Sequence, residues 1–122
     1  PHKDQGNERK FRAKVDKISR RLTQAGAVIA ISYVQSPDNP ELDQEDYGAT
    51  CCAIQNIQLA AWEEGIVCQW STSRVWKSPL MRSRLEMTEK ESLVGLLFLG
   101  YPTAKLEGRR YKGVAEISRW QS

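Results

Sequence analysis

Few side chains in this sequence have the types and the spacing that acid–base or nucleophilic catalysis requires. No residue looks like a nucleophile with a base at hand. Glu45 and Asp46 could be read as paired carboxylates for proton transfer, but neighbouring side chains on a helix diverge. Their place near the start of a predicted helix, where negative charge is favourable, explains them fully. We therefore predict no catalytic side chain.

The strongest candidates for ligand binding are Trp70, Ser71 and Thr72, which stand at the end of a short apolar run. At the end of a strand, a backbone N–H and a hydroxyl can face a cleft without distorting the sheet. The alternative interpretation is a capped turn with a packed tryptophan. Two other tryptophans, Trp62 and Trp76, are interpreted as packing residues rather than as ligand contacts.

Cysteine usage and charge argue against several other kinds of site. Cys51, Cys52 and Cys68 make an odd number with no CxxC spacing, and the adjacent pair cannot close a normal disulfide. A zinc site would need clustered Cys and His, and the only histidine is His2, so we predict no metal. The net charge of +3 comes mostly from Lys and Arg near the two ends, without the signature of a nucleic-acid-binding fold. We expect no nucleic-acid partner.

Length and hydropathy predict one domain that does not enter a membrane. The 122 residues suit a single domain over 1–122. Hydrophobic residues make up 40% and charged residues 27%, which is ordinary for a globular protein. The longest apolar run, Leu93 to Leu99, is far shorter than the roughly 20 residues of a membrane helix. The expectation is a cytoplasmic location with no membrane partner.

Hydrophobic periodicity predicts helices and strands in alternation. Apolar residues recur at helical spacing from Phe11 to Leu22, and Gly26 ends that segment. Three short apolar runs rich in branched side chains predict strands, the first of them buried. The predicted strands are Ala27–Val34, Ile66–Trp70 and Ser92–Leu99. The predicted loops are Ser36–Glu41 and Ser71–Lys77, and Ser78 with Pro79 predicts the start of a short helix to Leu85.

A longer helix is predicted from about Asp43 to Glu64, with acidic residues in its first turns and Gly65 at its end. Its middle, Ala49 to Ala61, is apolar or small on nearly every face. Such a helix needs neighbours all round, more than this short chain supplies. Gln55 and Asn56 are interpreted as buried amides that tie the helix to an adjacent backbone.

Four phrases of the sequence occur in an order and at a spacing that carry a family signature. They are the acidic helix start at 45–49, Gln55-Asn56 with Leu59-Ala60-Ala61, Trp70-Ser71-Thr72, and Val94-Gly95-Leu96-Leu97-Phe98-Leu99-Gly100-Tyr101-Pro102. Together they resemble the carboxyl-terminal half of the flavin-dependent nitroreductase family. The resemblance covers roughly residues 33–110.

The resemblance implies an α+β fold, with a mixed sheet flanked by helices. The family's opening segment, which holds the flavin phosphate, has no counterpart in this sequence, so we expect the fold to be incomplete at its N-terminus. Because nitroreductase tails commonly wrap the partner subunit, the resemblance also implies a homodimer. The basic tail over 103–122 is expected to pack on that partner through Val114, Ile117 and Trp120.

The resemblance further implies FMN as the cofactor. In the family the loop after the second strand lies against the flavin, which assigns Trp70, Ser71 and Thr72 to cofactor contact. Arg109 and Arg110 stand where relatives place a basic residue that reaches the flavin phosphate, and a guanidinium group matches phosphate oxygens two at a time. The alternative for both arginines is a solvated tail charge.

One departure from the family pattern concerns loop shape. Ser73 stands where many relatives carry Gly or Asn, a position that often needs an unusual backbone angle.

The implied reaction is a two-step exchange. A hydride passes from NAD(P)H, the co-substrate, to the flavin, and electrons then leave to a small-molecule acceptor such as a nitroaromatic or a quinone. The alternative function is that of a truncated, flavin-free nitroreductase-like domain that acts as a binding or regulatory partner.

Overall fold

The computed structural model describes residues 13, 15–104, 107–108 and 111–121. Residues 15–24 are helical. The elements that follow are β1 (Ala27–Val34), α2 (Pro40–Glu63), β2 (Val67–Ser71), the 3₁₀ helix η1 (Arg74–Lys77), α3 (Pro79–Arg84), β3 (Glu91–Gly100) and α4 (Val114–Ile117). Helices and strands therefore alternate as the periodicity predicts.

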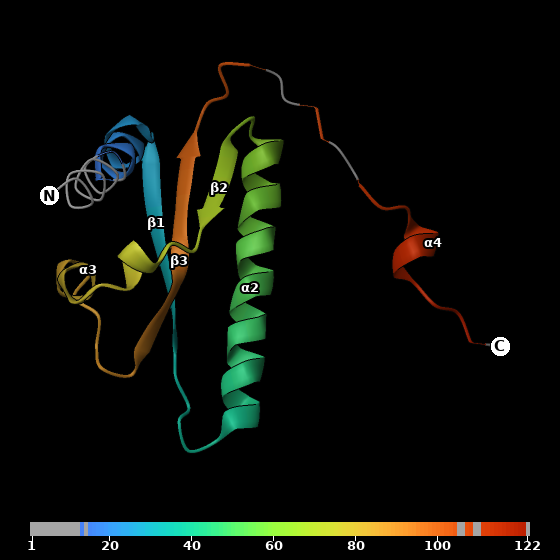
Figure 1. Ribbon diagram of the computed structural model, residues 1–122, viewed down its shortest axis with the longest axis horizontal. Helices are drawn as coiled ribbons and strands as arrows, with labels where there is room; N and C mark the ends of the chain where they lie inside the picture. Colours follow the sequence, from blue (N-terminus) through green and yellow to red (C-terminus); the bar gives the residue numbers. More distant parts are fainter. Residues whose placement is uncertain (1–12, 14, 105–106, 109–110, 122) are drawn as a thin grey trace, which may run out of the picture.

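The three strands form one sheet in the order β1-β3-β2, and both pairs are antiparallel. Figure 1 shows this sheet between α2 on one side and α3 on the other. Helices flanking a sheet agree with the expected fold class, although the described strands include none of the parallel pairs that a mixed sheet would have. The central strand, β3, carries most of the buried side chains.

Two hydrophobic clusters lie on the two faces of the sheet. The α2-side cluster consists of Ile54, Val94 and Leu97, with partly buried side chains of α2, β1 and β2 around it. The α3-side cluster consists of Trp76, Leu93, Leu96 and Phe98, and it is packed by the 15–24 helix, η1 and α3. Each face of β3 thus has its own core.

A β-bulge in β3 explains which residues reach which cluster. Strict alternation would place Leu93 and Leu97 on one face, but they belong to opposite clusters. The register with β1 shifts at this point: Ile31 pairs with Gly95 and Ser32 with Leu93, so Val94 is the extra residue. As a result Val94 and Gly95 both face the α2 side.

Helix α2 begins at Pro40, three residues earlier than predicted, so the loop predicted over 36–41 is too long. Asn39 is the N-cap, and its side-chain oxygen accepts a hydrogen bond of 3.2 Å from the backbone N–H of Leu42. Proline suits the first helical position because the backbone N–H that it lacks would make no hydrogen bond within the helix there. With this start, Glu45 and Asp46 lie in the second turn.

The C-terminal end of α2 also explains why β2 starts and ends one residue later than predicted. Gly65 has φ +73°, the left-handed conformation that favours glycine. The N–H of Gly65 bonds to the carbonyl of Trp62, and the N–H of Ile66 bonds to that of Ala61. Because Ile66 is engaged in this cap, the strand begins at Val67.

The prediction of a buried first strand is wrong. Residues 27–30 of β1 are exposed, and residues 31–33 are half-buried. None of residues 27–30 packs against either hydrophobic cluster, and β1 is an edge strand, paired only with β3 among the described strands. A run of apolar residues does not distinguish a central strand from an edge strand.

The predicted role of Gln55 and Asn56 as buried amides is also wrong, because both are exposed. Gln58 makes the contact instead: its side-chain nitrogen donates a hydrogen bond of 3.2 Å to the carbonyl of Cys68 in β2. The predicted loop over 71–77 likewise contains structure, with Ser71 in β2 and a 3₁₀ helix over Arg74–Lys77. The short helix is confirmed, with Ser78 capping the N–H of Met81.

The tail contains an unpredicted helical turn, α4, which lies apart from the sheet (Figure 1). The proposed anchors Val114, Ile117 and Trp120 are exposed on it and beyond it, and Trp120 is 88% exposed. Across the described residues no helix combines the length and the apolarity needed to cross a bilayer.

A hydrogen-bonded turn ties the start of β3 to β1 and α3. The carboxylate of Glu91 accepts hydrogen bonds from the N–H of Thr88 at 2.9 Å, from the Thr88 hydroxyl at 3.0 Å and from the Ser32 hydroxyl at 2.9 Å. Arg82 donates to the main-chain carbonyls of Glu91 and Thr88 at 2.9 and 2.7 Å. The donors to the carboxylate, first the Thr88 N–H, lower the pKa of Glu91.

The lowered pKa of Glu91 predicts an acid-dependent loss of stability. A carboxyl whose pKa is lower in the folded state stabilises the fold above its unfolded pKa, about 4.3, and this contribution is lost as pH falls through the folded pKa. In urea unfolding between pH 6 and pH 3, Glu91→Gln is expected to flatten the fall in the free energy of unfolding. Glu89→Gln, a carboxylate in the same turn without these hydrogen bonds, is the control; identical slopes for the two variants would contradict the prediction.

Candidate functional site

The Trp70-Ser71-Thr72 segment lies where β2 ends. Trp70 pairs with Leu97 and Ser71 with Leu96 in the centre of the sheet. The side chain of Trp70 packs against the α2-side cluster, and its Nε1 atom is buried with no hydrogen-bond partner among the described residues. The side chain of Trp70 therefore faces α2 and offers no polar side-chain atom to a ligand in solution.

Ser71 faces the opposite side of the sheet. Its hydroxyl oxygen accepts a hydrogen bond of 2.9 Å from Trp76 Nε1. Trp76 is only 1% exposed, and its ring centroid lies 5.8 Å from that of Phe98. The prediction that Trp76 is a packing residue is therefore confirmed, and Ser71 contributes to holding it. Trp62, in contrast, is 63% exposed.

Thr72 is the one member of the predicted triplet that is exposed. Within the described part of the chain its hydroxyl makes no hydrogen bond, so it is available to a ligand. The next residue, Ser73, has φ −56°, an ordinary value that any residue adopts. The serine at this position therefore does not strain the loop.

The predicted phosphate ligands, Arg109 and Arg110, lie outside the described residues. Their segment follows β3, which ends at Gly100, and Gly100 pairs with Val67 at the start of β2. Thr72 follows the other end of β2. The chain therefore leaves β3 at the end of the sheet opposite to Thr72, and about five residues of strand, roughly 16 Å, separate the two ends.

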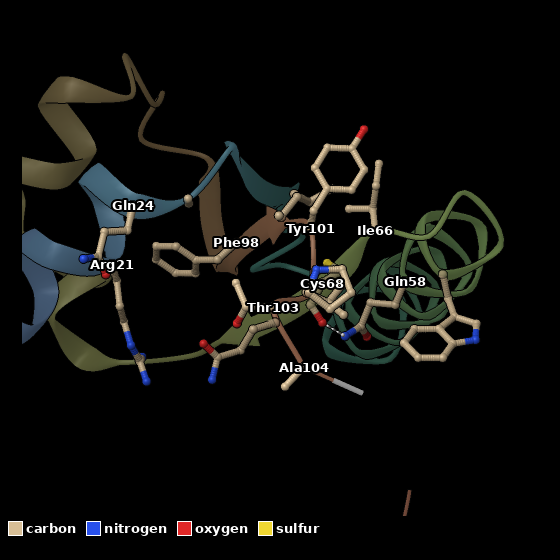
Figure 2. A pocket seen from close by; sticks show the side chains of 16 residues that line it. Arg21, Gln24, Gln58, Ile66, Cys68, Phe98, Tyr101, Thr103 and Ala104 are labelled. Carbon is tan, nitrogen blue, oxygen red and sulfur yellow. Dashed lines mark hydrogen bonds between the residues drawn. The ribbon is translucent and has the colours of Figure 1, made fainter. Parts of the chain in front are cut away.

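A cleft of about 760 Å³ opens at the Gly100 end of the sheet. Figure 2 shows Phe98 and Cys68 between Arg21 and Gln24 of the 15–24 helix on one side and Gln58 of α2 on the other. The dashed line there is the hydrogen bond from Gln58 to the carbonyl of Cys68. Sequence reasoning missed this cleft, because its walls come from four segments that are distant in sequence.

The chemistry of the cleft is that of binding rather than of proton transfer. Burial raises the pKa of the Cys68 thiol, so the thiol stays protonated near neutral pH and is a poor nucleophile. Arg21 supplies a cation, while Gln24 and Gln69 supply amides beside the apolar side chain of Phe98. Among the described residues that line the cleft there is no carboxylate side chain and no histidine.

A second group of titratable residues lies where β1 meets the start of α2. The Tyr33 hydroxyl donates to the Asp43 carboxylate at 3.2 Å, and the Tyr33 and Tyr47 rings meet edge to face at 5.8 Å. Burial, followed by the negative charge of Asp43, raises the pKa of Tyr33, and a hydrogen bond with Cys51 raises the pKa of Tyr47. Both phenols stay neutral, and we interpret the group as structural.

In the portion of the chain that the structure describes, no three His, Cys, Asp or Glu residues come close enough to hold a metal ion. The three cysteines are free thiols, with Cys52 exposed on α2.

The chain is similar both to a protein-family model and to a solved structure. A family model described as the nitroreductase family matches residues 1–101. A solved nitroreductase-like family protein from Bacillus cereus superposes with a TM-score of 0.80 and 31% identity, covering 94% of this chain and 60% of its own. The match to the family model ends before Arg109 and Arg110.

Two curated relatives match shorter stretches. The Bacillus subtilis (strain 168) protein "Putative NAD(P)H nitroreductase YfhC" is 29% identical over 68 residues, which are 56% of this chain and 35% of the relative. The Escherichia coli (strain K12) protein "Putative NAD(P)H nitroreductase YdjA" is 33% identical over 54 residues, 44% of this chain and 30% of the relative. The matched parts span about a third of each relative.

Proposed function

The chain belongs to the nitroreductase family, and from this premise we propose that it is part of an FMN-dependent oxidoreductase that uses NAD(P)H. The observation that carries the proposal is the family match over residues 1–101, together with the fold shared with the Bacillus cereus protein. The names of the two curated relatives, each of which contains the words "Putative NAD(P)H nitroreductase", support the class of reaction. The acceptor we propose is a small nitroaromatic or quinone-type molecule.

The residues at the end of β2 fit a flavin contact in part. When bound, FMN would supply the redox chemistry, accepting a hydride and passing electrons on. The free, exposed hydroxyl of Thr72 suits a polar atom of such a ligand. Trp70 and Ser71, whose side chains are engaged in packing and in the bond to Trp76, are better suited to holding Thr72 in place.

We further propose a homodimer. Support comes from large apolar side chains that are exposed on α2 and on the tail, such as Leu59, Trp62 and Trp120. Leu59 and Trp62 lie three residues apart on α2 and so share one face of that helix, and exposed apolar surface of this kind often marks an interface. The free state of all three cysteines supports a reducing, cytoplasmic compartment.

The proposal is tested by flavin binding to the native protein. We expect the purified protein to bind FMN with a visible flavin absorbance band, and we expect NADPH or NADH to bleach that band before an added quinone restores it. Sedimentation of the same sample is expected to give the mass of two chains. A colourless protein that binds no added FMN would instead favour the flavin-free partner domain.

Thr72→Val is expected to raise the dissociation constant of FMN about two- to tenfold, because it removes one hydrogen bond and keeps the shape of the side chain. Thr72→Ser, which retains the hydroxyl, should bind FMN almost as the parent protein does. Thr103→Val is the matched control, since Thr103 is an exposed threonine in the cleft at the opposite end of the sheet. If Thr103→Val weakened FMN binding and Thr72→Val did not, the flavin would bind in the cleft and not beside Thr72.

A further inference from the structure

Gly95 lies against the Trp70-Ser71 segment more closely than any side chain could allow. A Cβ atom at Gly95 would stand 2.5 Å from Trp70 Nε1, 2.9 Å from Trp70 Cδ1 and 2.7 Å from the carbonyl oxygen of Ser71. Real Cβ atoms essentially never approach other heavy atoms below 3.0 Å. In contrast, a Cβ at Gly100 on the same strand would meet only a backbone atom of Gly26, at 3.9 Å.

Regular alternation along β3 creates this contact. Gly95 lies two residues before Leu97, which belongs to the α2-side cluster, so Gly95 also faces the α2 side, where the indole of Trp70 lies. Trp70 pairs with Leu97, which makes Gly95 its diagonal neighbour on the same face. The bulge at Val94 lies before this stretch of β3 and leaves the facing of Gly95 unchanged. The position of Trp70 therefore depends on the absence of a side chain at Gly95.

The indole of Trp70 is held by shape and not by hydrogen bonding. Its one polar atom, Nε1, is buried and has no partner among the described residues. Its ring lies between the β3 backbone at Gly95 and the α2-side cluster. An indole held only by these two surfaces moves when either surface moves.

Ser71, the residue after Trp70, is also held in place by its contacts. The Ser71 carbonyl lies against Gly95, while the Ser71 hydroxyl accepts the bond from Trp76 on the other face. Two consecutive residues are thus located on opposite faces of the sheet, directly before the exposed Thr72. A shift of either residue is passed to Thr72 through one or two peptide bonds.

We propose that Gly95 is a positioning residue for Thr72, acting through Trp70 and Ser71. Because Gly95 has no side chain, the Trp70-Ser71 segment can lie directly against the β3 backbone. The position of this segment in turn determines where the Thr72 hydroxyl lies. This inference rests on the proposed flavin site for its consequence, but its structural part concerns this chain alone.

The test compares Gly95→Ala with Gly100→Ala in the native protein. We expect Gly95→Ala to shift the amide NMR signals of residues 70–73 and the indole N–H signal of Trp70, and to raise the dissociation constant of FMN about tenfold at a temperature where the protein is fully folded. Gly100→Ala is expected to leave the signals of residues 70–73 and the FMN affinity unchanged. A lower unfolding midpoint for Gly95→Ala, with those signals and the affinity intact, would overturn the inference.

A second variant covers the case in which Gly95→Ala does not fold. Trp70→Phe keeps an aromatic ring but loosens the contact with Gly95, and it is expected to shift the signals of Ser71, Thr72 and Ser73. Unchanged signals at Thr72 in this variant would overturn the inference. If the parent protein binds no FMN, the proposed function fails, while the NMR shifts still decide whether Gly95 positions Thr72.

Discussion

Trp76→Ala is expected to lower the free energy of unfolding by about 3–5 kcal/mol. Trp76 is 1% exposed and lies at the centre of the α3-side cluster, with Phe98 beside it. Its removal leaves a cavity between the sheet and α3, and it also leaves the Ser71 hydroxyl without its donor. The measurement is urea unfolding of the native protein, followed by circular dichroism.

Trp76→Phe separates the two contributions. It keeps most of the ring volume but removes the donor to Ser71, so we expect a smaller loss, about 1–2 kcal/mol. Ser71→Ala should reproduce the hydrogen-bond part of that loss without a cavity. A loss below about 1 kcal/mol for Trp76→Ala would mean that the α3-side cluster contributes little to stability.

The double change Arg109→Ala and Arg110→Ala is expected to weaken FMN binding by more than a hundredfold at low salt. Each guanidinium can donate two charge-assisted hydrogen bonds to the FMN phosphate, and each such interaction contributes about 1.5–3 kcal/mol. Because both residues lie in the tail, the free energy of unfolding should change little. Isothermal titration with FMN measures the effect.

Riboflavin provides the sharpest control, because it lacks the phosphate. Its affinity should be the same for the parent protein and for the double variant. Arg119→Ala, which removes an exposed charge from the same tail, should leave FMN binding unchanged. Equal losses for FMN and riboflavin would mean that the two arginines do not bind the phosphate.

Elements with a local signal in the sequence are the ones that sequence reasoning predicts correctly. The short helix at Pro79 follows from Ser78 and the proline, and the structure contains that cap. The longer helix α2 ends as predicted at Gly65, because a left-handed residue and two backbone hydrogen bonds lie within a few positions of one another. Its start is misplaced in the prediction, because Pro40 suits a loop as well as the first turn of a helix.

The candidate site was only partly accessible to the same reasoning. The Trp70-Ser71-Thr72 phrase identifies a segment, but its pattern does not say which side chain faces solvent. In the structure Trp70 and Ser71 turn to opposite faces of the sheet, and Thr72 is exposed. The cleft bounded by Arg21 and Gln58 has no sequence motif, because its walls meet only when the chain has folded.

The order of helices and strands can be predicted from residues that are close together in the chain, because periodicity and helix caps are local. The family can be recognised in the same way, because its motifs are short. Packing between distant segments, in contrast, makes β1 an exposed edge and makes Gln58, rather than Gln55 or Asn56, the residue that binds β2. The same packing brings Gly95 beneath Trp70. These features depend on how segments far apart in the chain pair and pack, and a one-residue slip in strand register would turn Gly95 to the other face.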